Sequence, residues 1–85
     1  MSVKPRLRRG VRLTYDKVRE THVLLYPEGV LVPNKTAAAV LELCDGESTV
    51  ADITAALGKH YRGVQEADVN GVLSRLVERR VVEWL

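Results

Sequence analysis

Hydrophobic and polar residues alternate along residues 11–16, as they do in a half-buried strand. Two further short apolar segments follow, His22 to Tyr26 and Val30 to Val32, separated by Pro27-Glu28-Gly29. Proline presets φ for the first turn position, and glycine tolerates the positive φ that a three-residue hairpin loop needs. We therefore predict a three-stranded antiparallel meander over residues 11–32.

The apolar pattern then changes to the 3.6-residue period of amphipathic helices. It predicts helices over Lys35 to Cys44, from about residue 50 to residue 61, and over Glu66 to Arg80. Asn34 precedes the first of these and is a favoured N-cap residue. The last segment, Val81 to Leu85, is apolar enough to form a short strand or a packed extension.

Strands followed by helices predict an α+β fold. We expect a three-stranded antiparallel sheet followed by three helices, similar to a winged helix-turn-helix. The 85 residues suffice for one small domain. The charged segment 1–10, which contains Pro5 and Gly10, is expected to be a flexible basic tail, and residues 11–85 the domain proper.

Charge is unevenly distributed along the chain. Five bases and no acid lie in residues 1–12, whereas the remaining 8 bases face all 11 acids. A basic tail on a mildly acidic body is typical of a docking arm or a linker, and both interpretations stay open. The single cysteine excludes an internal disulfide, which favours the cytoplasm, and no apolar segment is long enough to span a membrane.

Few side chains are candidates for catalysis. Only His22 and His60 titrate near neutral pH, and neither has a catalytic partner nearby in the sequence. Cys44 completes an apolar helical stripe, as a buried structural thiol does. Metal-ligand spacings and phosphate-binding glycine loops are missing from the sequence. We therefore expect no enzymatic activity, no metal site and no cofactor.

DNA binding is the main alternative, because the helix at residues 66–80 resembles a recognition helix in its position. Three arginines on this helix are balanced by three acids, of which Glu66 and Asp68 occupy the first turn. Phosphate contacts require uncompensated cations, so this charge pattern disfavours nucleic acid as a partner.

Peptide binding fits the remaining features better. The segment Val30 to Val32 leads directly into a helix, so one side of this strand has no predicted partner. An unpaired strand edge offers backbone N–H and C=O groups to an extended peptide, and a neighbouring helix can select its side chains. Polar residues lie on both flanks of the stripe of the last helix, and the sequence leaves open which flank faces the edge.

Four motifs resemble the pyrroloquinoline quinone (PQQ) biosynthesis protein D family. They are GVRL at Gly10 to Leu13, VLLYPEGVL at Val23 to Leu31, NKTA at Asn34 to Ala37 and LCDG at Leu43 to Gly46. Pro33 departs from the family pattern, since relatives more often carry another residue there, and it removes one N–H donor near the edge strand.

The resemblance implies a non-catalytic peptide chaperone. Proteins of this family bind the ribosomal precursor peptide, whose Glu and Tyr become the cofactor, and present it to a radical S-adenosylmethionine (SAM) enzyme. The peptide docks between the third strand and the third helix. The matching peptide-binding positions here are Gly29, Val30, Leu31, Val32, Asp68, Val69, Val72, Arg75, Leu76 and Arg79.

Two expectations concern partners. Arg6, Arg8 and Arg9 in the basic tail are candidate contacts for the partner enzyme. We expect a monomer, with pairing of the free edge or exchange of strands between two copies as the alternative.

Overall fold

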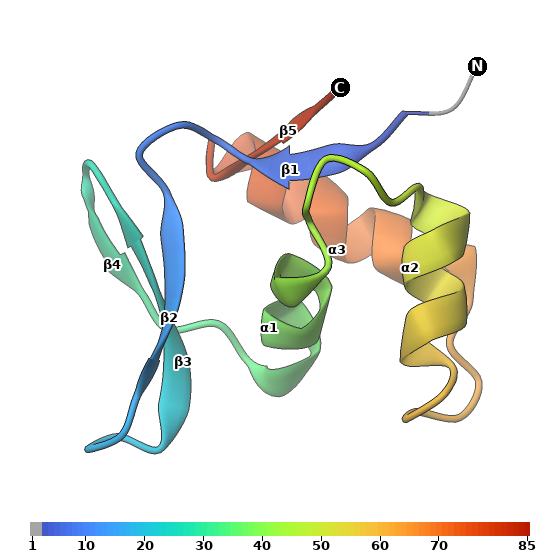
Figure 1. The fold of residues 1–85 in the computed structure, drawn as a ribbon, viewed down its shortest axis with the longest axis horizontal. Helices are drawn as coiled ribbons and strands as arrows, with labels where there is room; N and C mark the ends of the chain where they lie inside the picture. The colour runs from blue at the N-terminus through green and yellow to red at the C-terminus, as the bar shows by residue number, and fades with distance from the viewer. Residues whose placement is uncertain (1–2) are drawn as a thin grey trace.

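A computed structural model describes residues 3–85 (Figure 1). A three-stranded antiparallel sheet in the order β2-β3-β4 is followed by three helices, which confirms the predicted α+β architecture. The strands are β2 (Arg12–Asp16), β3 (Thr21–Tyr26) and β4 (Gly29–Leu31), and the helices are α1 (Lys35–Glu42), α2 (Val50–Leu57) and α3 (Glu66–Glu78). The likeness to winged helix-turn-helix proteins stays a prediction.

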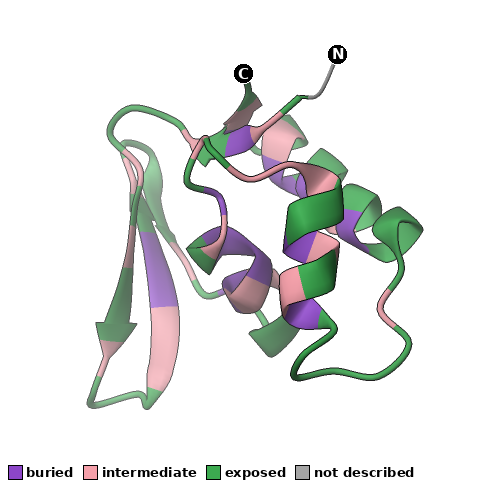
Figure 2. Cartoon of the chain, turned by 45° about the vertical axis from the view of Figure 1, so that its right-hand side comes forward, coloured by how far each residue is buried: buried purple, intermediate pink, exposed green. Residues whose placement is uncertain are grey.

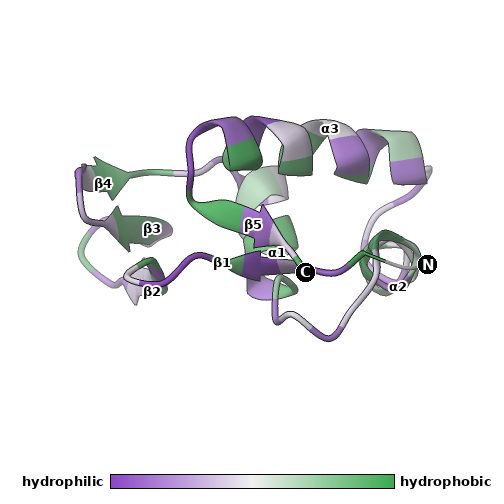
Figure 3. Ribbon diagram, turned by 90° about the horizontal axis from the view of Figure 1, so that it is seen from above, coloured by the Kyte–Doolittle hydropathy of each residue, from purple (hydrophilic) through white to green (hydrophobic). Residues whose placement is uncertain are grey.

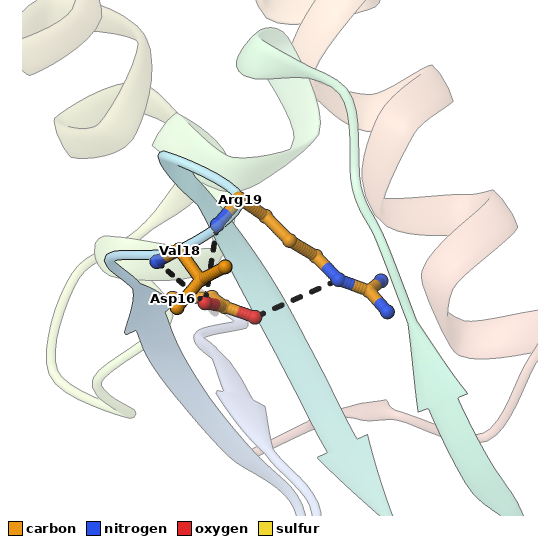
Figure 4. A network of polar contacts seen from close by, with 3 residues as sticks. All are labelled: Asp16, Val18 and Arg19. Atoms are coloured by element: carbon orange, nitrogen blue, oxygen red, sulfur yellow. Dashed lines mark hydrogen bonds and ion pairs between the residues drawn. The ribbon is translucent and has the colours of Figure 1, made fainter.

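The turn between β2 and β3 is organised by one carboxylate (Figure 4). The Oδ1 atom of Asp16 accepts hydrogen bonds from the backbone N–H groups of Val18, at 2.9 Å, and Arg19, at 3.2 Å. The Arg19 Nε atom lies 3.7 Å from the other carboxylate oxygen. Asp16 thus replaces missing backbone partners in the turn, as aspartates commonly do.

The hairpin between β3 and β4 has a shorter loop than the sequence predicted. Tyr26 pairs directly with Gly29, so the loop consists of two residues, Pro27 and Glu28. Gly29 has a φ of 152°, and it is the first residue of β4 rather than the last residue of the loop. The positive φ of Gly29 is therefore as predicted, but the residue belongs to the strand and not to the loop.

α1 begins after Asn34 as predicted, and α2 begins at a capping box. Asn34 accepts a hydrogen bond from the Ala37 N–H at 2.8 Å, and Thr49 and Asp52 form a reciprocal capping box. α3 ends at Glu78, two residues before the predicted end, because Arg80 adopts a left-handed φ of 61°. The N–H groups of Arg80 and Val81 then bond back to α3 carbonyls in the pattern of a Schellman motif.

The N-terminal segment is not a flexible tail throughout. Pro5–Leu7 form strand β1, which pairs antiparallel with β5 (Val82–Trp84), and the two strands lie together at the top of the view in Figure 1. Pro5 is fully buried, and Arg6 forms an ion pair with Glu83 at 2.7 Å. The high charge of this segment concealed the strand, because only one face of it is buried. Of the predicted tail, Met1 and Ser2 lie outside the described residues.

The hydrophobic core lies among the helices, the inner face of the sheet and β5 (Figure 2). Leu24 is fully buried there, whereas its neighbour Leu25 lies on the opposite, exposed face of the sheet. The core is aliphatic, since the chain lacks phenylalanine. Its buried members are Leu24, Val40, Leu41, Cys44, Ile53, Leu57, Val69, Leu73, Leu76, Val81 and Val82. None of the helices in residues 3–85 has the length and apolarity to cross a membrane.

Candidate functional site: the open edge of β4 and the adjoining groove

The edge strand β4 pairs with β3 on one side only. Within residues 3–85, no other strand is hydrogen-bonded to it, and β5 pairs with β1 instead. The apolar C-terminal segment therefore does not cover this edge. Val30 is 59% exposed and Val32 is 49% exposed. The predicted open edge is present in the structure.

The hairpin register determines which backbone groups face this edge. Tyr26 and Gly29 flank a two-residue loop, so they form the hydrogen-bonded pair that closes the hairpin. Hydrogen-bonded and non-hydrogen-bonded pairs alternate along antiparallel strands, which makes Val30 and Leu25 a non-hydrogen-bonded pair. The N–H and C=O groups of Val30 consequently point away from β3, towards the open edge.

The same alternation limits the effect of Pro33. The amide of Leu31 faces β3, and Pro33 is in phase with Leu31 rather than with Val30. The donor that proline lacks therefore belongs to the side of β3. Pro33 is also buried, so its ring packs against the protein. The N–H donor that Pro33 removes is therefore not one that an added peptide strand on β4 would use.

A groove of about 380 Å³ lies between β4 and α3, and we call it the β4–α3 groove. Viewed from above, β4 is the strand of the sheet on the α3 side of the molecule (Figure 3). The groove is lined by Leu31, Pro33, Asn34, Thr36, Ala37, Val72, Arg75, Leu76 and Arg79. The α3 flank that carries Arg75 and Arg79 thus faces the edge, which the sequence alone left open.

The orientation of α3 follows from its buried stripe. Val69, Leu73 and Leu76 pack into the core, and this leaves the side of Val72, Arg75 and Arg79 turned towards β4. The Arg75 Nε–H donates to the Gly71 carbonyl at 3.3 Å. Within residues 3–85 neither Arg75 nor Arg79 forms an ion pair, so the groove presents uncompensated positive charge.

Half of the predicted peptide-binding positions line the β4–α3 groove, and the others lie around it. Leu31, Val72, Arg75, Leu76 and Arg79 line the groove itself. Gly29, Val30 and Val32 lie along the exposed edge beside it. Asp68 and Val69 instead line a second hollow farther along α3.

Sequence reasoning missed the contribution of the segment between β4 and α1. The groove is lined by Pro33, Asn34, Thr36 and Ala37, none of which the sequence analysis assigned to the binding site. The NKTA motif was the available signal, because it belongs to the segments that carry the family resemblance.

Two of the candidate catalytic side chains, His22 and Cys44, have structural roles. His22 Nε2 lies 2.8 Å from the Glu42 carboxylate, and the His22 ring contacts that of Tyr15 edge to face. Burial, with a smaller contribution from the Asp45 charge, raises the pKa of Cys44 to about 12. A thiol with this pKa is not a nucleophile at neutral pH. No group of three or more metal-ligating side chains occurs within residues 3–85.

The three arginines expected to contact a partner enzyme differ in their surroundings. Arg6 is engaged with Glu83 across the β1–β5 pair. Arg8 and Arg9 follow β1, are exposed, and form no ion pair with any described residue. Of these three arginines, Arg8 and Arg9 are therefore the ones available to contact a partner.

Proteins of known sequence provide an independent comparison. Residues 21–82 match the family model "Coenzyme PQQ synthesis protein D (PqqD)". A "PqqA binding protein" of Kluyvera intermedia is 38% identical over 84 residues, which cover 96% of this chain and 91% of that protein. A "Bifunctional coenzyme PQQ synthesis protein C/D" of Methylorubrum extorquens is 46% identical over 93% of this chain, which spans 22% of the length of that relative.

Solved structures agree with these matches. The solution NMR structure of the PqqD truncation of Methylobacterium extorquens PqqCD superposes with a TM-score of 0.77 at 46% identity, covering 93% of this chain and 87% of that one. It is described as a functional, stand-alone recognition element for ribosomally synthesised and post-translationally modified peptides. The heterocyclase TruD shares the fold (TM-score 0.71, 21% identity, 98% of this chain and 12% of TruD). The chain belongs to the PqqD family.

Proposed function

We propose that this protein is a non-catalytic, peptide-binding chaperone of PQQ biosynthesis. It binds the PqqA precursor peptide as an added strand on β4 and presents it to the radical SAM enzyme that crosslinks the Glu and Tyr side chains of the peptide. The observation that carries this proposal is the open edge of β4 beside the β4–α3 groove. Relatives that share most of their length with this chain are named for PqqA binding, which supports the same role.

The edge and the groove have separate roles in recognition. Val30 supplies a backbone donor and acceptor to the incoming strand, which gives affinity with little dependence on sequence. Alternate side chains of that strand then point into the groove against Leu31, Val72 and Leu76. Because Arg75 and Arg79 are uncompensated, a peptide segment that carries acidic residues is the favoured partner.

Presentation requires tethering rather than chemistry. A precursor held beside the enzyme has an effective concentration of roughly millimolar, without any new contact at the reacting carbons. The complex must also dissociate after the reaction, so we expect a binding free energy of about 8–10 kcal/mol, in the micromolar to submicromolar range. A monomer suits this role, because pairing of β4 with a second copy would occupy the same edge.

The proposal is tested by replacing Val30 with proline. This substitution deletes the outward N–H and places a ring where the peptide strand would dock, while the amides that face β3 remain. We expect PqqA affinity, measured by fluorescence anisotropy with labelled peptide, to fall at least tenfold. The far-UV circular dichroism spectrum should stay that of the wild type.

Val30→Thr is the matched control, because it changes the side chain but keeps the backbone donor, and it should bind PqqA with nearly wild-type affinity. Leu31→Pro is a poorer test, since the Leu31 amide faces β3 and its loss damages the sheet itself. Wild-type affinity in a folded Val30→Pro variant would exclude strand addition on β4.

A further inference from the structure

A second hollow, of about 490 Å³, continues the β4–α3 groove along α3. It lies between α1, the loop from α2 to α3 and the N-terminal half of α3, and we call it the α2–α3 pocket. Thr36, Val72 and Arg75 line both hollows, so the pocket directly adjoins the groove along α3. A peptide bound in the groove therefore lies next to the pocket, within reach of a side chain.

The floor of the α2–α3 pocket is apolar, and its rim is polar. The core residues Val40, Leu57 and Val69 form the floor. Within residues 3–85 no buried side-chain nitrogen or oxygen atom lacks a hydrogen-bond partner, so the floor offers nothing that a polar ligand would satisfy. Tyr61 and Arg62 lie at the exposed rim. Apolar walls with a few polar groups at the mouth are typical of ligand pockets of 300–1,000 Å³.

Gly71 in the wall of this pocket is not explained by the isolated fold. It lies in the middle of α3, where glycine destabilises a helix relative to alanine. Its φ is not in the left-handed region, and a Cβ added there would meet no atom within 4 Å. Neither backbone conformation nor internal packing requires glycine here. Glycine does leave the helix surface open here, so that a bound group can approach the backbone closely.

We propose that the α2–α3 pocket receives a large apolar side chain, aromatic or branched aliphatic, from the same PqqA peptide whose backbone extends β4. This inference rests on the proposed function and adds a second anchor to it. The pocket continues the groove, which argues for one continuous ligand. At the mouth, Arg62 and Arg75 outnumber Asp68, so an acidic residue next to the anchoring side chain is favoured.

Filling the pocket provides the first test. Gly71→Leu places a side chain in the open space at the wall, and we expect it to weaken PqqA binding about tenfold or more, the scale on which apolar pockets discriminate side chains. Gly71→Ala adds only one methyl group: it should raise the midpoint of thermal unfolding, and its PqqA affinity should lie between those of the wild type and Gly71→Leu. Ala67→Leu narrows the same pocket from an exposed position and should act like Gly71→Leu.

An alanine scan of the apolar residues of PqqA identifies the anchor. One substitution should weaken binding to the wild type about tenfold yet have little further effect on Gly71→Leu, because both changes remove the same contact. Full additivity for every peptide residue would overturn the proposal. Wild-type affinity in folded Gly71→Leu and Ala67→Leu variants would also overturn it.

Amide mapping separates this inference from the proposed function. In the wild type, PqqA should shift the amide resonances of Arg62, Gly63 and Val64 as well as that of Val30. Shifts confined to Val30 and its neighbours, with affinity still lost in Val30→Pro, would leave strand addition standing and reject the pocket. An unchanged Val30→Pro variant would reject strand addition itself.

Discussion

The turn after α1 shows how single residues hold the N-terminal strand in place. Asp45 accepts hydrogen bonds from the backbone N–H groups of Glu47 and Ser48, at 2.8 and 2.9 Å, and these bonds lower the pKa of its carboxyl group. Gly46 donates its N–H to the Pro5 carbonyl of β1. The LCDG motif is thus a structural feature that joins α1 to β1 and lies outside the groove.

Gly46 differs from Gly71 in that the fold requires it. Its φ is +77°, and an added Cβ would lie 3.1 Å from Leu85 Cδ1 and 3.4 Å from the Arg6 Cβ. We expect Gly46→Ala to lower the free energy of unfolding by about 1–3 kcal/mol, the cost of a strained non-glycine residue. Urea denaturation measures this loss. Gly71→Ala, with a helical φ and open space, should instead be stabilising, and equal effects at both positions would contradict this account.

Cys44 predicts a dependence of stability on alkaline pH. Its pKa rises from 9.0 to about 12 on folding, so between these values the unfolded chain releases the thiol proton while the folded protein keeps it. Stability is therefore fully present below about pH 9 and decreases as pH rises towards 12, by at most about 1.4 kcal/mol per pH unit from this group. The measurement is the slope of unfolding free energy against pH in wild type and Cys44→Ala.

The slope, and not the absolute stability, is diagnostic in that comparison. Cys44→Ala also removes a buried side chain and the hydrogen bond from its Sγ to the Val40 carbonyl, both of which lower stability at every pH. The variant should nevertheless lose less stability than the wild type between pH 9 and 11. If the slopes for the wild type and Cys44→Ala were equal, the pKa of the thiol would be the same in the folded and the unfolded protein.

At the level of elements, the sequence predicted what local patterns determine. Alternation predicted β2, short apolar segments around a turn predicted β3 and β4, and Asn34 predicted the start of α1, because these signals depend on neighbours in the chain. The early end of α3 was missed, since it depends on Arg80 adopting a conformation that glycine usually supplies. Strand β1 was missed because its partner β5 is distant in the sequence: Arg6 and Glu83, which form an ion pair between the two strands, are 77 residues apart.

The candidate site was predictable only in part for the same reason. The open edge follows from the order of the elements, so residues 30–32 could be identified from the sequence. To predict the groove, one must also know which side of α3 faces β4. That orientation is fixed by the packing of Leu73 and Leu76 in the core. The α2–α3 pocket joins residues from three elements, and no motif in the sequence marks it.

At the level of the whole molecule, the basic segment near the N-terminus is the proposed contact for the partner enzyme. Removal of residues 1–9 would delete β1 and its pairing with β5, so a loss of binding could reflect misfolding. Reversing the charge of Arg8 and Arg9 alone avoids this. We expect the double variant Arg8→Glu/Arg9→Glu to bind PqqA normally and to associate at least threefold more weakly with the radical SAM enzyme, as measured by biolayer interferometry.

Arg6→Gln is the companion variant, because Arg6 is engaged with Glu83 and should contribute to stability more than to association. If the double variant associates with the enzyme as tightly as the wild type, the exposed arginines are not a docking arm. The peptide-binding edge would be unaffected by that result.

The pairing of β1 with β5 also determines how this domain can be built into longer polypeptides. Lys4 and Leu85 exchange backbone hydrogen bonds in both directions, at 2.8 and 3.3 Å. A polypeptide that enters at Lys4 thus leaves again beside its point of entry, so a host protein could carry the domain as an insertion in a surface loop. The β4 edge would stay accessible in such an arrangement. The same peptide-binding domain could therefore be fused to different modifying enzymes without structural change in either partner.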